Sequence, residues 1–149
     1  MKNLNKHLTD VLVLRLLLLI IILLSNSCAT NPVTGEREFM LVSEQQELAL
    51  GADAIPNLNW AYNGIYRDPE LENYLDNLVK KIWTVSERPH IPMRFAIQNT
   101  SLPNAFALPG YVAITRGLLV ELENEAQFMA VIGHEVAHVM ARHTAKRLS

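Results

Sequence analysis

The chain has one cysteine, no surplus of basic residues and only one long hydrophobic run. A single cysteine excludes an intrachain disulfide framework and any metal site built from several cysteines. With 13 Lys and Arg against 15 Asp and Glu, the formal charge is -2 and the pI is near 6.2. This balance argues against nucleic acid as a partner. A length of 149 residues allows one domain at most.

The hydrophobic run lies near the N-terminus and raises the mean hydropathy of the chain to +0.11. Lys2, Lys6 and Arg15 come before an apolar run over residues 16–24. Nine helical residues cover about 14 Å, whereas the hydrocarbon core of a bilayer is about 30 Å thick. An export signal is therefore favoured over a spanning helix. We predict that residues 1–27 are a lipoprotein-type signal peptide.

Cys28 follows the hydrophobic run directly after Ser27, which resembles the lipobox of bacterial lipoproteins. In such a site the cysteine carries the lipid and anchors the mature protein to a membrane. Ala29 follows instead of an aspartate, which resembles lipoproteins sorted to the outer membrane. We therefore expect an exported protein on the periplasmic face of a bacterial membrane. Leu24 stands four residues before the cysteine rather than three, so a simple signal peptide or an uncleaved anchor stays an alternative.

The segment after the signal peptide is predicted to be a tether that leads into a helix. Residues 28–42 contain proline, glycine and charges of both signs, which indicates a tether. Ser43 and Gln46 have the spacing of a capping box and predict a helix from residue 44 to about residue 54. Pro56 is expected to end this helix.

A second helix and two strands are predicted in the middle of the chain. Asp68 stands as an N-cap before a proline, and apolar residues then recur at helical spacing over residues 69–85. Alternation of apolar and polar residues predicts a strand around 93–97, and the segment 111–115, which follows a turn, is predicted as a second strand. Prolines bound a turn region between the two strands, over residues 103–110.

Asn124 predicts the start of a long final helix that runs to about Lys146. Together these elements predict an α+β fold in which helices pack on a small β-sheet and the final helix is central. Residues 43–149 are expected to form this domain.

The final helix contains the sequence HEVAH, with His134, Glu135 and His138. On a helix the two histidines lie one turn apart and about 40° from each other, so both imidazoles can reach one Zn²⁺ at about 2.0–2.1 Å. Glu135 lies beside that position, where a general base can take a proton from water. We predict His134 and His138 as metal ligands, Glu135 as the catalytic residue and one Zn²⁺ per chain. Two surface histidines on an amphipathic helix are the alternative.

His143 lies five residues after His138, about 140° further around a continuous helix. It can approach the same metal only if the helix breaks. We therefore expect His143 on the surface or in a supporting position.

Several ordered segments resemble the CAAX prenyl protease-type zinc metallopeptidases, which are HExxH gluzincins, and among them the periplasmic lipoprotein members. The segments that carry the resemblance, besides HEVAH, are NPVTG (31–35), SEQQE (43–47), NAFALPG (104–110), YVAITRGLL (111–119) and ARH (141–143). Members of this family usually have two glycines after the proline at position 109, whereas Gly110 stands alone in this chain.

The resemblance implies a polypeptide substrate and the residues that bind it. In the family the strand at 111–115 is an edge strand that lines the cleft, which implies β-augmentation by the substrate backbone. The candidate substrate-binding residues of this strand are Tyr111, Val112, Ala113, Ile114 and Thr115. A plain core strand is the alternative. Asn104 is a candidate to present its amide to the substrate, and turn formation explains it equally well.

The resemblance also implies a third zinc ligand, a glutamate on a later helix. Only 11 residues follow His138, and none of them is Asp or Glu. Glu121, Glu123 and Glu125 precede the motif by more than two helical turns. The third protein ligand is thus not in this sequence, and we expect a chain that is C-terminally truncated relative to a complete enzyme.

Three functions are compatible with these observations. The first is a zinc-dependent metalloendopeptidase of the cell envelope that hydrolyses peptide bonds in protein quality control, with a membrane attachment through its N-terminal lipid. The second is a non-catalytic, peptide-binding or chaperone-like lipoprotein, because the third zinc ligand is absent. The third is a lipid-anchored structural protein with a chance HExxH motif.

Overall fold

The computed structural model describes residues 12–19 and 28–147. Residues 12–19 are helical and expose their hydrophobic side chains. Within the described part of the chain, no helix is both long enough and apolar enough to cross a membrane. The rest of the predicted signal peptide, residues 1–11 and 20–27, lies outside the described residues. The export signal and the lipid on Cys28 therefore stay predictions.

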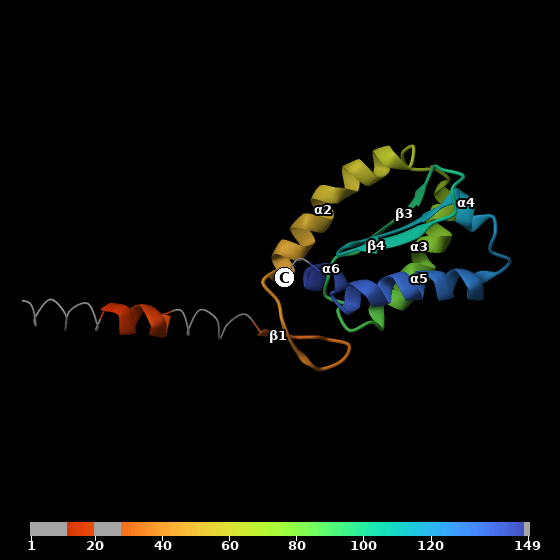
Figure 1. Ribbon diagram of the computed structural model, residues 1–149. Helices are drawn as coiled ribbons and strands as arrows, with labels where there is room; N and C mark the ends of the chain where they lie inside the picture. The colour runs from red at the N-terminus through yellow and green to blue at the C-terminus, as the bar shows by residue number, and fades with distance from the viewer. Residues whose placement is uncertain (1–11, 20–27, 148–149) are drawn as a thin grey trace, which may run out of the picture.

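The fold is α+β, as the sequence predicts (Figure 1). Its elements are, in chain order, β1 (Cys28–Thr30), β2 (Arg37–Phe39), α2 (Glu44–Ala61), α3 (Pro69–Thr84), β3 (Arg94–Gln98), β4 (Ala105–Leu108), β5 (Tyr111–Thr115), α4 (Arg116–Leu119), α5 (Glu125–Met140) and α6 (His143–Arg147).

A β-hairpin occupies the segment that the sequence analysis predicts as a tether. β1 and β2 pair antiparallel, and the hairpin contacts the C-terminal end of the described chain. The side-chain amide of Asn31 donates to the backbone oxygen of Ala141 at 3.4 Å, and Lys146 pairs with Glu38 at 3.0 Å. Residues 28–42 are therefore folded onto the domain, because their polar side chains find partners that are distant in the sequence.

The main sheet has three strands in the order β3-β5-β4. β5 lies in the centre, parallel to β3 and antiparallel to β4, and all five of its residues are buried. The expectation that residues 111–115 form an edge strand is therefore wrong, and the alternative of a core strand is confirmed. The two edge positions belong to β3 and to β4, and β4 lies in the segment predicted as a turn region.

A tight turn of Pro109 and Gly110 joins β4 to β5. Leu108 pairs directly with Tyr111, and Gly110 has a φ of +80°. A proline followed by a glycine with positive φ is the pattern that a type II turn favours. One glycine is therefore enough to close this hairpin.

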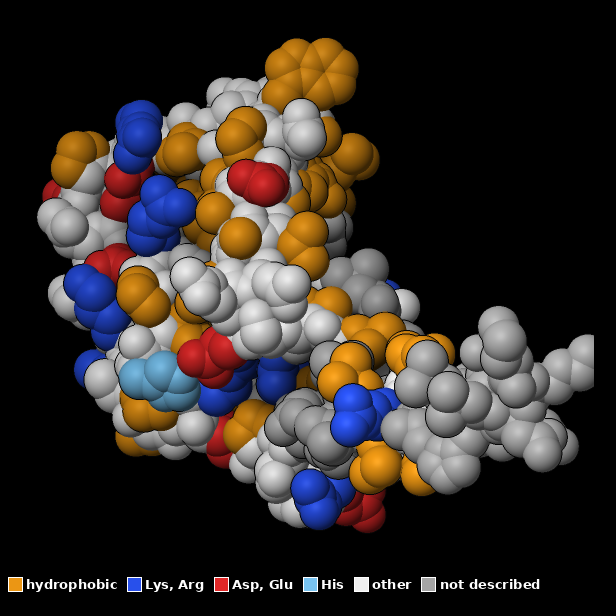
Figure 2. All heavy atoms as spheres, turned by 90° about the vertical axis from the view of Figure 1, so that its left-hand side faces the viewer, with side chains coloured by type: hydrophobic (Ala, Val, Ile, Leu, Met, Phe, Trp, Pro, Cys, Tyr) orange, Lys and Arg blue, Asp and Glu red, His pale blue; other side chains and the backbone are white. Residues whose placement is uncertain are grey.

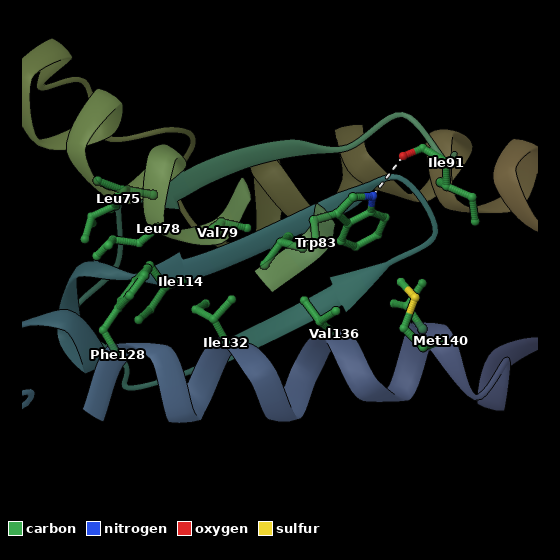
Figure 3. Packing of buried hydrophobic residues seen from close by; sticks show 13 residues of the cluster. Leu75, Leu78, Val79, Trp83, Ile91, Ile114, Phe128, Ile132, Val136 and Met140 are labelled. Atoms are coloured by element: carbon green, nitrogen blue, oxygen red, sulfur yellow. Dashed lines mark hydrogen bonds between the residues drawn. The ribbon is translucent and has the colours of Figure 1, made fainter. Parts of the chain in front are cut away.

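Helices cover both faces of the sheet (Figure 1). α3 and α5 pack on one face, where the larger hydrophobic core lies (Figure 3). In this core the indole nitrogen of Trp83 donates to the backbone oxygen of Ile91 at 2.9 Å. A smaller core of Ala96, Tyr111 and Ala113 lies on the other face, towards α2. The sheet is thus fixed between layers, and α5 is held against it.

Helix α2 is longer than the sequence predicts. Its capping box is confirmed, because the Ser43 side chain accepts from the Gln46 N–H and the Gln46 side chain accepts from the Ser43 N–H. The helix continues through Pro56 to Ala61, so the predicted end near residue 54 is wrong. Pro56 and Ala52 are both exposed, so the carbonyl of Ala52, which loses its helical partner, belongs to a residue at the solvent-facing surface. The outward side of α2 carries exposed hydrophobic side chains (Figure 2).

Helix α3 forms as predicted. Its N-cap Asp68 accepts from the backbone N–H of Leu71 at 3.2 Å, and Pro69 is the first helical residue. The apolar face recognised in the sequence supplies the buried residues of the helix, which are Leu75, Leu78, Val79 and Trp83.

Candidate metal centre

Helix α5 carries the HEVAH sequence on a frame that the hydrophobic core fixes. Asn124 caps the helix by accepting from the backbone N–H of Gln127 at 3.0 Å. The buried side chains of the helix are Phe128, Ile132, Val136, Val139 and Met140. Figure 3 shows Phe128, Ile132, Val136 and Met140 pointing from α5 into the core. Because these residues are spaced three and four apart, they occupy one face of the helix. His134 and His138 lie outside this face and are exposed. Glu135, which lies between them in the sequence, is half-buried.

The structure brings His134 and His138 together. Their Nε2 atoms lie 3.1 Å apart, and their rings meet edge to face with centroids 4.6 Å apart. The two nitrogens therefore converge on one point at the surface of α5, as the four-residue spacing predicts.

This pair fits two ligand positions of a single zinc ion. Two nitrogens bound tetrahedrally at about 2.0–2.1 Å lie about 3.3 Å from each other, close to the observed separation of 3.1 Å. A catalytic zinc site takes three protein ligands. Among residues 12–19 and 28–147, no group of three or more His, Cys, Asp or Glu side chains is arranged to hold a metal ion. The described residues thus supply two ligands.

His143 lies against the outer nitrogen of His138. The Nδ1 atoms of the two rings are 2.7 Å apart, and the ring centroids are 4.9 Å apart. The predicted continuous helix to Lys146 is wrong: α5 ends at Met140, and α6 begins at His143. The break brings His143 back towards α5, so that its side chain is exposed, as one of the two alternatives predicts, and also contacts His138.

The break occurs at Arg142, whose φ of +55° lies in the left-handed region. Its Nε donates to Oε2 of Glu47 at 3.0 Å, and its Nη2 donates to the backbone oxygen of Val42 at 2.9 Å. These bonds hold a non-glycine residue in a conformation that it rarely adopts. No glycine or proline stands at this position to predict the break from the sequence. The residue that stabilises it, Glu47, lies 95 residues earlier in the chain.

Sequence reasoning missed a buried charge network behind the HEVAH helix. Glu47 and Arg88 have side chains that are 1% and 2% exposed, and Arg88 Nη2 donates to Glu47 Oε2 at 2.9 Å. Arg88 also donates to the backbone oxygen of Val139 in α5 at 2.9 Å. The network therefore ties α2 to the C-terminal end of the helix that carries the histidines.

Glu44 extends this network to the surface. Burial raises the pKa of Glu44, but the hydrogen bonds with His90 and Arg88 together lower it by more. The pKa of Glu44 therefore lies below its ordinary value. The charged carboxylate is therefore the form that the fold favours.

The other predicted site residues are engaged within the fold. The side-chain amide of Asn104 donates to the Tyr62 hydroxyl at 2.7 Å, and its backbone N–H donates to Thr115 Oγ1 at 2.9 Å. The Tyr111 hydroxyl accepts from Gln98 at 2.8 Å, and burial raises the pKa of Tyr111. β5 has its backbone paired on both sides, whereas α5 packs along the edge strand β4.

Comparison with known proteins identifies the family of this chain. Residues 67–149, which include the sheet and the HEVAH helix, match the model of peptidase family M48. The chain belongs to this family of peptidases.

Curated relatives carry peptidase names. The mitochondrial metalloendopeptidase OMA1 of Schizosaccharomyces pombe is 30% identical over 79% of this chain and 36% of its own length. The beta-barrel assembly-enhancing protease of Yersinia pestis is 29% identical over 78% of this chain and 24% of its own length. The protein of the same name from Escherichia coli K12 is 28% identical over 83% of this chain and 26% of its own length. The chain thus spans about a quarter to just over a third of these relatives.

Proposed function

We propose that the protein is a zinc-dependent metalloendopeptidase that hydrolyses peptide bonds. The observation that carries the proposal is the convergence of the His134 and His138 Nε2 atoms, 3.1 Å apart, on either side of Glu135 in the sequence. Membership of peptidase family M48 supports the same reading.

Each residue of the motif has a distinct role in this proposal. His134 and His138 hold one Zn²⁺ through their Nε2 atoms. When bound, the ion lowers the pKa of water and polarises the scissile carbonyl. Glu135, half-buried on the same helix, takes a proton from the attacking water and passes it to the leaving amine.

We propose that the substrate backbone pairs with the outer edge of β4. β-Augmentation needs a strand with an open edge, and β5 is paired with a strand on each side. β4 lies at the edge of the sheet and packs along α5, which carries the histidines. We therefore assign to residues 105–108 the substrate contacts that the family resemblance implies for residues 111–115.

We further propose an envelope location and a quality-control role, in the CAAX-type branch whose periplasmic members are lipoproteins. The apolar run before Cys28 supports an exported outer-membrane lipoprotein, and two relatives are named beta-barrel assembly-enhancing proteases. Incorporation of labelled fatty acid into the wild type, and its loss in Cys28→Ser, is the expected result. Equal labelling of both proteins would contradict the lipid anchor.

A peptide-binding or chaperone-like role is the second candidate function. It is favoured by the edge position of β4, which can pair with an extended peptide whether or not that peptide is cut. Zinc stoichiometry and casein hydrolysis, measured on the wild type and Glu135→Gln, distinguish the candidates. The peptidase predicts hydrolysis that is lost in Glu135→Gln although zinc is retained. Hydrolysis that survives in Glu135→Gln contradicts the proposed role of this residue, and casein binding without hydrolysis favours the second candidate.

A further inference from the structure

We infer that His143 is a positioning residue for the metal centre: it accepts the Nδ1 proton of His138 and thereby holds the His138 ring with Nε2 towards His134. The inference rests on the proposed function, because it takes His134 and His138 as the metal-binding pair. It adds a side chain that the HEVAH motif does not contain.

The two contacts of His138 compete for its single proton. A neutral imidazole carries one N–H donor and one acceptor nitrogen. If the proton is on Nε2, it points at His134 Nε2, 3.1 Å away, and blocks the lone pair that a metal needs. If the proton is on Nδ1, it is donated to His143 Nδ1, 2.7 Å away, and Nε2 is free to bind metal.

The acceptor nitrogen of His143 therefore favours the tautomer of His138 that binds a metal. This arrangement agrees with metal-binding histidines in general, whose second ring nitrogen usually donates to a carboxylate, a carbonyl oxygen or water. Here an imidazole nitrogen takes that place. Donation to Nδ1 also requires the proton of His143 to be on its Nε2 atom.

The backbone at Arg142 is what makes this contact possible. On a continuous helix, residues five apart lie about 140° from each other and cannot meet. The left-handed conformation of Arg142 starts a new helix at His143, and the bonds of Arg142 to Glu47 and Val42 hold that conformation. The position of His143 is thus specified by contacts outside the HEVAH helix.

The test is the zinc affinity of the purified protein, measured by competition with a chromogenic chelator. We expect His143→Ala to weaken zinc binding by about 10–100-fold, the range seen when such partners are removed. His143→Asn should retain most of the affinity, because its side-chain oxygen can accept from His138 Nδ1. Thr144→Ala is the matched control, since Thr144 is an exposed residue of α6 directly after His143, and it should leave the affinity unchanged.

His134→Ala separates a failure of this inference from a failure of the proposed metal site. Loss of zinc binding in His134→Ala together with an unchanged affinity in His143→Ala overturns the inference and leaves the metal site intact. Zinc binding that persists in His134→Ala overturns the metal site, and the inference with it.

A second readout follows the proton itself and needs neither metal nor activity. Long-range ¹H–¹⁵N spectra of the metal-free wild type should show His138 mainly as the Nδ1–H tautomer. His143→Ala should raise the Nε2–H population, and His143→Asn should restore the wild-type pattern. A wild-type His138 that is mainly Nε2–H would overturn the inference, whatever the variants do.

Discussion

The Nε atom of Arg142 donates to Oε2 of Glu47 at 3.0 Å, so the break between α5 and α6 is joined to the first turn of α2. Arg88 donates to the same carboxylate oxygen at 2.9 Å. One buried carboxylate therefore pairs with two guanidinium groups behind the helix that carries His134 and His138, and Glu44 supplies a second carboxylate to Arg88. The metal centre depends on this network through the position of α5 and of His143.

Removal of the shared carboxylate should destabilise the protein strongly. Glu47→Gln removes the carboxylate that pairs with Arg142 and leaves Arg88 with Glu44 alone, and breaking a buried pair in this way costs about 3–5 kcal/mol. Urea unfolding of the variant should show this loss of free energy of unfolding. Glu87→Gln, at an exposed position, is the matched control and should stay within about 0.5 kcal/mol of the wild type. Similar values for the two variants would contradict the account.

The left-handed backbone at position 142 should distinguish glycine from alanine. Arg142→Gly and Arg142→Ala both lose the bonds to Glu47 and Val42, so both should be less stable than the wild type. Alanine also bears the cost of a positive φ, about 1–2 kcal/mol, which glycine avoids. We expect thermal unfolding of the alanine variant at a lower temperature. Equal melting temperatures would show that the break relaxes without its native conformation.

Two glycines in helices should respond to alanine in opposite directions. A Cβ at Gly117 would lie 2.1 Å from the backbone oxygen of Ser101, so Gly117→Ala forces the backbone apart and should cost about 1–3 kcal/mol. A Cβ at Gly133 meets nothing within 4 Å, so Gly133→Ala should stabilise α5 by about 0.5–1 kcal/mol. Chemical unfolding of both variants measures the contrast. A loss of stability in Gly133→Ala would contradict the open space beside this residue.

The carboxylate of Glu44 should make stability depend on pH in the acid range. Because the folded-state pKa of Glu44 is lowered, its contribution is fully present above the unfolded-state pKa of about 4.3. It is lost as the pH falls through the lower folded-state value. The difference in melting temperature between the wild type and Glu44→Gln should therefore shrink between about pH 5 and pH 3. A difference that stays constant over this range would refute the assignment.

Local rules were sufficient where a signal and its structural effect lie within one turn. Ser43 with Gln46 and Asp68 with Pro69 each begin a helix as predicted, because an N-cap acts on N–H groups two or three residues away. The approach of His134 to His138 is also local, since helix geometry alone sets it. These cases cover the starts of the helices and the two ligand candidates.

The errors arise where partners distant in the sequence decide the structure. Nothing near Tyr111 indicates that β5 is flanked by two strands, and that pairing places it in the centre of the sheet. Nothing near Arg142 indicates a helix break, because the residue that holds it is Glu47. The contact of His143 with His138 follows from that break, so the continuous helix predicted from the sequence could not place the two rings together.

The central claim is that His134 and His138 together hold one zinc ion with Glu135 beside it as the base. Calorimetric titration of zinc into the purified wild type, His134→Ala and Glu135→Gln tests this claim most directly. The account predicts one zinc per wild-type chain, loss of binding in His134→Ala, and an unchanged stoichiometry in Glu135→Gln. Zinc binding in His134→Ala with the affinity and stoichiometry of the wild type would contradict it.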